Sequence, residues 1–273
     1  MIIPLLLTQG ISLSNPEALS PGTWLLLNFY GSIIFIILTL LYWKKIHKKP
    51  LKDMGITKAF GSYFLGALLG ILSVTAALLI SVFAGSVQYQ GMVSKPDIKL
   101  LLLFLGGFLI QGAMEETLCR GLVLHGLKEK TSLLVAAFFS TLVFILPHWN
   151  SLLEGTLLFS VLSILNMVLV SLIWVLLTVR LHSIWAACGF HSLWNYLLFN
   201  IYGLNLSGND SPVPVLLNFQ AQGENVLNGG QIGLEASVIT TAVLSILLIF
   251  LMINRKKMVH SSPEQTSRNL PNI

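Results

Sequence analysis

The chain has 273 residues, of which 55% are hydrophobic and only 10% are charged, whereas a soluble domain carries about 25% charged residues. This composition excludes an ordinary soluble protein and favours one that lies in a lipid bilayer. The formal net charge is +5, but the basic residues follow the pattern of membrane orientation signals. We therefore expect the bilayer, and no nucleic acid, as a partner.

Seven apolar segments approach or reach the length of about 20 residues that a membrane-spanning helix needs. In chain order they are residues 24–43, 61–84, 98–118, 133–147, 157–179, 183–202 and 236–253. The predicted fold class is all-α, a polytopic transmembrane helical bundle of seven spans, or of eight if residues 1–20 add a membrane segment. One integral-membrane domain would cover residues 1–273, and the polar tail, residues 259–273, would be disordered.

The basic residues divide unequally between the loops that join these segments. Fourteen of the sixteen fall on one side of a seven-span chain, within residues 44–58, 120–130, 180 and 255–268, and only Lys95 and Lys99 fall on the other. Because basic loops stay in the cytoplasm, we expect the N-terminus outside and the C-terminus inside. The loop 203–235 has no Lys or Arg and is expected outside.

Several ionisable or strongly polar side chains lie within or at the edge of the predicted spans. Such groups are costly in a bilayer and are usually functional. They are Glu115, Glu116 and Arg120 in EETLCR, His148 in FILPH, Asn166 in the fifth span, and His191 and Asn195 in HSLWN. We interpret Asn166 as a residue that joins helices, because polar side chains form hydrogen bonds across membrane helices.

Helical geometry brings the other groups to a similar depth. Glu115 and His148 are each about 16 residues from a turn predicted at 130–132, which corresponds to roughly 24 Å along two antiparallel helices. The helix of Glu115 must then continue almost to that turn. His191 and Asn195 are four residues apart, so they share one helix face. These four side chains are expected to line one cavity that opens towards the cytoplasm or laterally to lipid.

Glu116 and Arg120 are also four residues apart, so they can form an ion pair on one helix face. Glu115 points about 100° away from Glu116 around the helix. The pairing would therefore leave Glu115 without a partner on its own helix. A buried carboxylate without a partner suits general-base chemistry.

The three motifs, EExxxR, FxxxH and HxxxN, follow one another on separate predicted helices. In this arrangement they resemble the CAAX-processing and bacteriocin-processing (CPBP, or ABI) family of intramembrane endopeptidases, which includes the type II CAAX prenyl endopeptidases. The resemblance covers residues 100–200, the expected catalytic core. Further similarity lies in RGLVLHGL after the first motif, SIWAACGFH before the third, and GGQIGLE before the last span.

The resemblance implies a membrane-embedded protease. Glu115 and His148 would hold and activate a water molecule, while His191 and Asn195 would donate hydrogen bonds to the developing oxyanion. The ion pair of the first motif would be structural or would orient Glu115. The resemblance implies either a glutamate-type protease or a metalloprotease. We expect no cofactor, and a zinc site built from one carboxylate and two histidines is the alternative.

The expected substrate is a peptide or a membrane-anchored protein, cut near the cytoplasmic leaflet. One option is removal of the last three residues after a prenylated cysteine. The other is peptide maturation or protection against bacteriocins, because many relatives of similar layout look bacterial. The chain would then lie in a bacterial plasma membrane.

Two interpretations without proteolysis stay open: a non-catalytic immunity or scaffold protein, and an ion translocator. A translocator would carry polar residues through the full membrane thickness, whereas here they gather at one depth.

Overall fold

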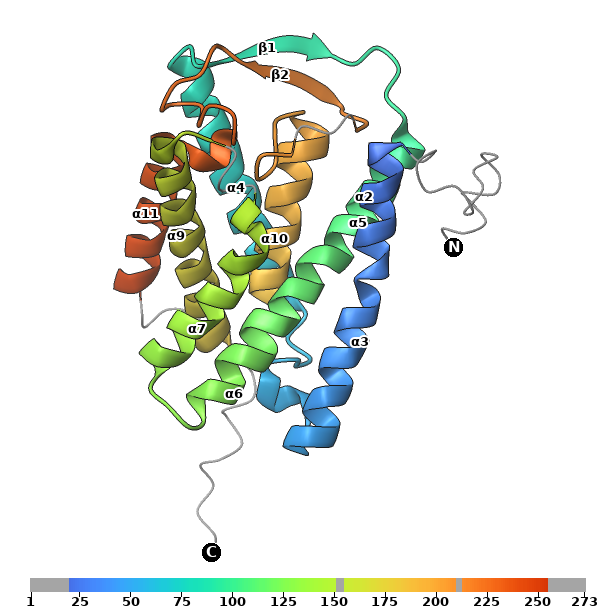
Figure 1. Cartoon of the computed structure of the whole chain (residues 1–273), viewed down its shortest axis with the longest axis vertical. Helices are drawn as coiled ribbons and strands as arrows, with labels where there is room; N and C mark the ends of the chain where they lie inside the picture. The colour runs from blue at the N-terminus through green and yellow to red at the C-terminus, as the bar shows by residue number, and fades with distance from the viewer. Residues whose placement is uncertain (1–19, 151–154, 210–212, 255–273) are drawn as a thin grey trace, which may run out of the picture.

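The computed structural model describes residues 20–150, 155–209 and 213–254. Within these residues the helices form one bundle, and a two-stranded ribbon crosses one end of it (Figure 1). The predictions for residues 1–19, for the basic residues from Arg255 onwards and for the polar tail lie outside the described residues.

Every apolar segment predicted from the sequence is helical. The first comprises α2 (Pro21–Gly31), α3 (Ile33–Tyr42) and the π-helix η2 (Trp43–His47), followed by the 3-10 helix η3 (Leu51–Met54), and the second is α4 (Gly61–Phe83). The third comprises α5 (Ile98–Glu116), the π-helix η4 (Thr117–Leu124) and α6 (His125–Lys128). The others are α7 (Leu133–Ile145) with the 3-10 helix η5 (Leu146–His148), α9 (Leu157–Leu181), α10 (Trp185–Tyr196) with the π-helix η6 (Leu197–Ile201), and α11 (Val238–Ile253), which follows the 3-10 helix η7 (Leu234–Ala236). The helix of Glu115 thus continues to Lys128, as predicted.

Polar side chains mark where three of these helices begin. Asp97, Ser132 and Ser237 each accept a hydrogen bond from the backbone N–H three residues later, at 2.9, 3.3 and 3.0 Å. Such caps satisfy backbone donors that the first helical turn leaves unpaired. The starts of α5, α7 and α11 are therefore fixed locally, by one short polar residue before each apolar run.

The predicted number of spans is only partly supported. Among the described residues, four helices are long and apolar enough to cross a membrane, namely Pro21–His47, Gly61–Phe83, Ile98–Lys128 and Leu157–Leu181. Two apolar helices, Leu133–His148 and Val238–Ile253, are shorter, and α10 carries polar residues and is buried along most of its length. Because α10 faces protein rather than lipid, it needs no long apolar run. The structure supports an integral membrane protein, and a count of seven or eight spans is not confirmed.

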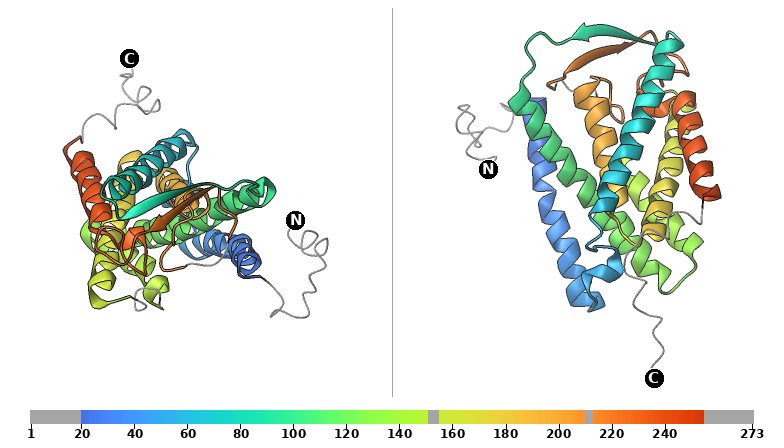
Figure 2. Two further views of the ribbon diagram at one scale, coloured as in Figure 1. Left: turned by 90° about the horizontal axis from the view of Figure 1, so that it is seen from above. Right: turned by 180° about the vertical axis from the view of Figure 1, so that it is seen from behind.

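The described residues are mostly helical, in agreement with the all-α prediction, but a two-stranded ribbon at one end of the bundle was not predicted. There β1 (Val87–Met92) pairs antiparallel with β2 (Leu217–Ala221), and the two strands cross over the helix ends (Figure 2). The register shifts between Tyr89 and Gly91, where Gly91 has a φ of 113°, a conformation that favours glycine. Each strand is short and lies in a loop outside the apolar runs, so hydropathy gives little signal for the ribbon.

Helix α10 packs against α4, α5 and α9 in the bundle. Its approach to α4 depends on glycine. A Cβ atom on Gly66 would lie 1.8 Å from the carbonyl oxygen of Ala186, and one on Gly189 would lie 2.1 Å from that of Tyr63. Small residues at such crossings let helix backbones come together in membrane proteins. These glycines thus allow the close packing that positions α10, the helix that carries the HxxxN motif.

The outer surface and the two ends of the bundle agree with a membrane location. Helix α3 has no buried residue, and Ile34, Phe35 and Leu38 on it are 58%, 61% and 55% exposed, which suits contact with lipid. The basic segments in η2 and α6 lie at the end away from the ribbon, whereas the linker from β1 to α5 lies beside the ribbon (Figure 1). The unequal basic distribution thus corresponds to two physical ends of the molecule.

Candidate active site

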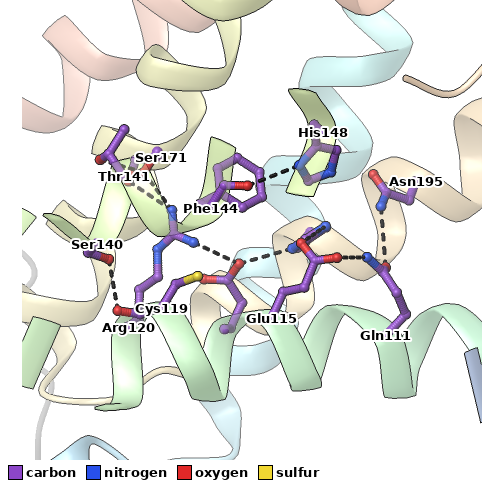
Figure 3. A network of polar contacts seen from close by, with 12 residues as sticks. Gln111, Glu115, Cys119, Arg120, Ser140, Thr141, Phe144, His148, Ser171 and Asn195 are labelled. Carbon is purple, nitrogen blue, oxygen red and sulfur yellow. Dashed lines mark hydrogen bonds and ion pairs between the residues drawn. The ribbon is translucent and has the colours of Figure 1, made fainter. Parts of the chain in front are cut away.

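Residues of all three sequence motifs come together in the interior of the bundle (Figure 3). The first motif lies at the junction of α5 and η4, the second at the end of α7 and in η5, and the third on α10. The α-helical conformation gives way to a π-helix directly after Glu116, and such changes are frequent at functional sites. Three of the four side chains expected in one cavity, those of His148, His191 and Asn195, line it, and Glu115 lies beside His191 without lining it.

Glu116 and Arg120 form the ion pair that their spacing predicts. Arg120 Nη1 lies 3.1 Å from Glu116 Oε1, and both side chains are fully buried. The other end of the guanidinium donates to Ser171 Oγ at 2.7 Å. Its carbon lies 5.0 and 4.9 Å from the ring centres of Phe144 and Trp174, and aromatic faces attract cations. Arg120 is thus held by a carboxylate, a hydroxyl and two aromatic rings.

His191 lies between the two glutamates. Its Nδ1 is 3.0 Å from Glu116 Oε1, and its Nε2 is 3.9 Å from Glu115 Oε2. The ring stacks on Trp174 with a centroid distance of 4.5 Å. A carboxylate oxygen can only accept, so Nδ1 carries the proton and Nε2 is the nitrogen left for chemistry. Glu116 therefore orients His191, a contact that we did not predict.

Glu115 has a partner on its own helix, so the prediction that it lacks one was wrong. Gln111, one turn earlier, donates from Nε2 to Glu115 Oε1. The Oε1 atom of Gln111 in turn accepts from Asn195 Nδ2 at 3.4 Å. The prediction considered only charged residues as partners of Glu115, and Gln111 is a neutral amide. Glu115 is also less enclosed than Glu116, with 20% of its side chain exposed.

His148 and Phe144 of the FxxxH motif are one helical turn apart. The Nδ1 atom of His148 lies 3.0 Å from the carbonyl oxygen of Phe144. A carbonyl accepts, so this nitrogen carries the proton and Nε2 keeps its lone pair. The Phe144 ring lies 5.3 Å from the His148 ring and 5.9 Å from the His191 ring. Phe144 therefore contacts both imidazoles.

One cavity is lined by His148, His191 and Asn195. Its volume is about 50 Å³, enough to hold a water molecule. Glu115 adjoins this group through His191. The cavity extends to Glu235 in η7 and to Thr240 in α11, which lie towards the ribbon (Figure 1). The polar lining of the cavity thus includes residues near the ribbon as well as the two histidines, and the expected opening towards the basic loops or to lipid stays a prediction.

Asn166 joins helices, as we interpreted it from the sequence. Its Nδ2 donates to the backbone oxygen of Glu235 at 2.8 Å, and its Oδ1 accepts from Thr241 Oγ1 at 2.7 Å. The Glu235 carboxylate accepts from Trp194 Nε1 at 3.0 Å and from the backbone nitrogen of Ser207 at 2.7 Å. These contacts fasten α9, α10 and the loop before α11 around the cavity.

Sequence reasoning missed Gln111, Ser171 and Trp174. Gln111 stands four residues before Glu115, so the same helical spacing that revealed the ion pair would have found it if amides had been included. Ser171 and Trp174 are three residues apart and share a face of α9, but nothing in the sequence says which helix that face meets. Trp174 contacts both His191 and Arg120.

The question of a metal at this site stays open. In the parts of the chain that the structure describes, no group of three or more His, Cys, Asp or Glu residues is arranged to hold a metal ion. Nδ1 of His191 faces Glu116, and Nδ1 of His148 faces a backbone carbonyl. Because Nε2 of each histidine stays available, these contacts are compatible with a metal ligand as well as with metal-free chemistry, and metal-free chemistry stays a prediction.

A helical membrane protein with two imidazoles in one cavity, and with a carboxylate and a buried ion pair beside them, is a candidate intramembrane hydrolase. Residues 97–197 match the family model described as type II CAAX prenyl endopeptidase Rce1-like. The match covers 101 of the 273 residues and confirms the resemblance to the CAAX-processing and bacteriocin-processing family in this region. No match was found among curated proteins or among solved structures. The family is one of proteases, which supports a hydrolase, and no comparison supports a role in bacteriocin immunity.

Proposed function

We propose that this protein is an intramembrane endopeptidase that hydrolyses a peptide bond of a membrane-associated or CAAX-like substrate. The observation that carries the proposal is that His148 and His191 line one cavity while Glu115 lies 3.9 Å from His191 Nε2, beside a fully buried ion pair. Ionisable groups gathered at one depth of a membrane bundle suit local chemistry better than transport across the bilayer.

Glu115 and His148 are the residues proposed to activate water. His148 Nε2 has a free lone pair and would hold the water molecule by accepting one of its hydrogens. The water oxygen attacks the carbonyl carbon of the substrate while its other proton passes to the Glu115 carboxylate. Glu115 then gives this proton to the leaving nitrogen, so the C–N bond breaks and an acid and an amine are released.

Asn195 and His191 are proposed to stabilise the oxyanion that forms in this step. The Asn195 amide has two N–H groups, of which one faces Gln111 and the other is free to donate to the substrate oxygen. His191 donates through Nε2 in its doubly protonated form. Donors held in place within a dry site stabilise developing charge without reorganisation.

The proposal is tested with purified protein in lipid nanodiscs and a peptide library that contains prenylated and unmodified cysteines. Glu115→Gln should slow cleavage about 10² to 10⁴-fold, the contribution of a general base, with an unchanged melting temperature. Glu129→Gln is the control, because Glu129 follows α6 and pairs at the surface with Lys49. Cleavage is read by mass spectrometry, which also identifies the bond cut and any need for the prenyl group.

Two outcomes contradict the proposal. One is equal turnover by the wild type and Glu115→Gln. The other is a folded wild-type protein that cleaves no peptide in the library, which would favour a non-catalytic scaffold.

A further inference from the structure

Gln111 connects two residues of the proposed active site that lie on different helices. It stands on α5, one turn before Glu115, and its amide group faces both Glu115 and Asn195 (Figure 3). Its Nε2 donates to the Glu115 carboxylate, and its Oε1 accepts from Asn195 Nδ2 at 3.4 Å. Neither EExxxR nor HxxxN includes this position.

The two ends of the Gln111 amide are chemically different, and this fixes the direction of the chain of contacts. An ionised carboxylate only accepts hydrogen bonds, so Glu115 requires the NH₂ end of the amide. The oxygen of Gln111 must then face Asn195, which in turn must present its own NH₂ group. A reversed amide would set two acceptors against each other at Glu115. Hydrogen bonds therefore run in one direction, from Asn195 through Gln111 to Glu115.

We infer that Gln111 is a positioning residue, which sets the orientation of the Glu115 carboxylate and of the Asn195 amide together. This inference rests on the proposed function, because it assumes that Glu115 acts on water and that Asn195 acts on the oxyanion. The contact at 3.4 Å is long for a hydrogen bond, and contacts of this kind tighten when substrate binds. Gln111 thus fixes the position of the base Glu115 on α5 relative to the oxyanion donor Asn195 on α10.

Two substitutions separate the contacts of Gln111. Gln111→Met keeps an unbranched chain of similar length and removes both hydrogen bonds. Gln111→Glu keeps an acceptor for Asn195 but sets a second carboxylate against Glu115, and like charges repel. Met114→Leu is the control, because Met114 lies on the same helix, is also half-buried, and has no polar contact with either residue.

The kinetic readout is the separation of kcat from KM. Gln111→Met should lower kcat roughly 10 to 100-fold, the cost of a small misplacement of reacting groups. KM should change little, because substrate binding does not depend on this contact. Gln111→Glu should lower kcat further, and Met114→Leu should match the wild type. Turnover by Gln111→Met equal to that of the wild type would overturn the inference.

A double-mutant cycle with Asn195→Ala tests whether Gln111 acts through Asn195. If it does, Gln111→Met combined with Asn195→Ala should be less slow than the product of the two single losses, because contacting residues are not additive, and the loss that Gln111→Met still adds reflects its contact with Glu115. Losses that multiply would overturn the inference. The same cycle is measured on melting temperatures, which require no substrate. If the wild type cleaves nothing, the proposed function fails, and additive melting shifts would separately overturn the link between Gln111 and Asn195.

Discussion

Glu115 and Glu116 are neighbours in the chain, yet their side chains lie in different surroundings. Glu115 keeps 20% of its side chain exposed and accepts a hydrogen bond from a neutral amide. Glu116 is fully buried and contacts both Arg120 and His191 through one oxygen. The first carboxylate is free to meet water, whereas the second is committed to two protein partners. Their surroundings support different roles for the two residues.

Glu116→Gln should lower the stability of the protein. The substitution leaves the buried Arg120 without its counter-charge, and removing one partner of a buried pair costs about 3 to 5 kcal/mol. We expect a lower melting temperature and a lower yield, with any loss of activity following from them and from the altered contact with His191. Adding Arg120→Gln should restore part of the melting temperature.

The matched control is Glu115→Gln, one residue away, which should melt near the wild type. Thermal unfolding of the three variants and the wild type is followed in one detergent. A Glu116→Gln protein that is well folded and inactive, alongside an active Glu115→Gln protein, would show that the two roles are reversed.

Chelators should leave cleavage unchanged. The described residues offer no group of three or more His, Cys, Asp or Glu arranged to hold a metal ion, and in the proposed mechanism Glu115 and His148 activate the water directly. Activity is compared before and after dialysis against EDTA and phenanthroline, with metal content measured by mass spectrometry. Loss of activity that zinc restores would contradict the metal-free mechanism.

The sequence predicted the site to the extent that helical spacing determines it. The pair of Glu116 with Arg120 and the shared face of His191 and Asn195 follow from residues four apart on one helix. Contacts between helices do not follow from the spacing of residues on one helix. Nothing in the sequence places His191 Nδ1 against Glu116, because that contact depends on how α5 and α10 cross. Apolar spacing in membrane helices does not set such a crossing, since lipid and neighbouring helices are equally apolar.

At the scale of elements, length and hydropathy predicted the long helices well. Helix α4 was predicted at residues 61–84 and observed at Gly61–Phe83, because an apolar run of this length has no other stable form in a bilayer. The β ribbon was missed because its strands lie in loops outside the apolar runs. The crossing of α4 and α10 was not predicted either, although the glycines that permit it are visible in the sequence.

Gly189→Ala should destabilise the bundle at this crossing. The added Cβ would lie 2.1 Å from the Tyr63 carbonyl oxygen and 2.9 Å from the Ala67 nitrogen, and neither backbone atom moves without shifting a helix. Overpacking of this kind costs about 1 to 3 kcal/mol, occasionally more. Because His191 lies two residues further along α10, cleavage should fall as well.

Gly31→Ala provides the control for this prediction. Gly31 is also helical, but nothing lies within 4 Å of the position that its Cβ would take. Alanine favours a helix over glycine by about 1 kcal/mol, so the melting temperature should stay the same or rise slightly. Equal melting temperatures for the two variants would mean that the crossing of α4 and α10 is not close-packed.

At the scale of the whole molecule, the bundle has two chemically different ends. The lysines of η2 and α6 lie at one end, and the ribbon lies at the other (Figure 1). The cavity beside His191 is lined from α9, α10 and the segment around the start of α11. The orientation of the protein decides which of the two ends faces the cytoplasm.

We predict that the ribbon lies outside and the lysine-rich end lies in the cytoplasm, because basic loops are retained there. Single cysteines at Gln90, on the exposed part of β1, and at Lys45, on the exposed part of η2, test this orientation. The native Cys119 and Cys188 are buried, so they should contribute little background. In intact cells a membrane-impermeant maleimide should label Gln90→Cys, and Lys45→Cys should react only after the membrane is permeabilised. Labelling of both positions from the same side would rule out a bundle that spans the membrane along its long axis, and the reverse pattern would place the basic end outside.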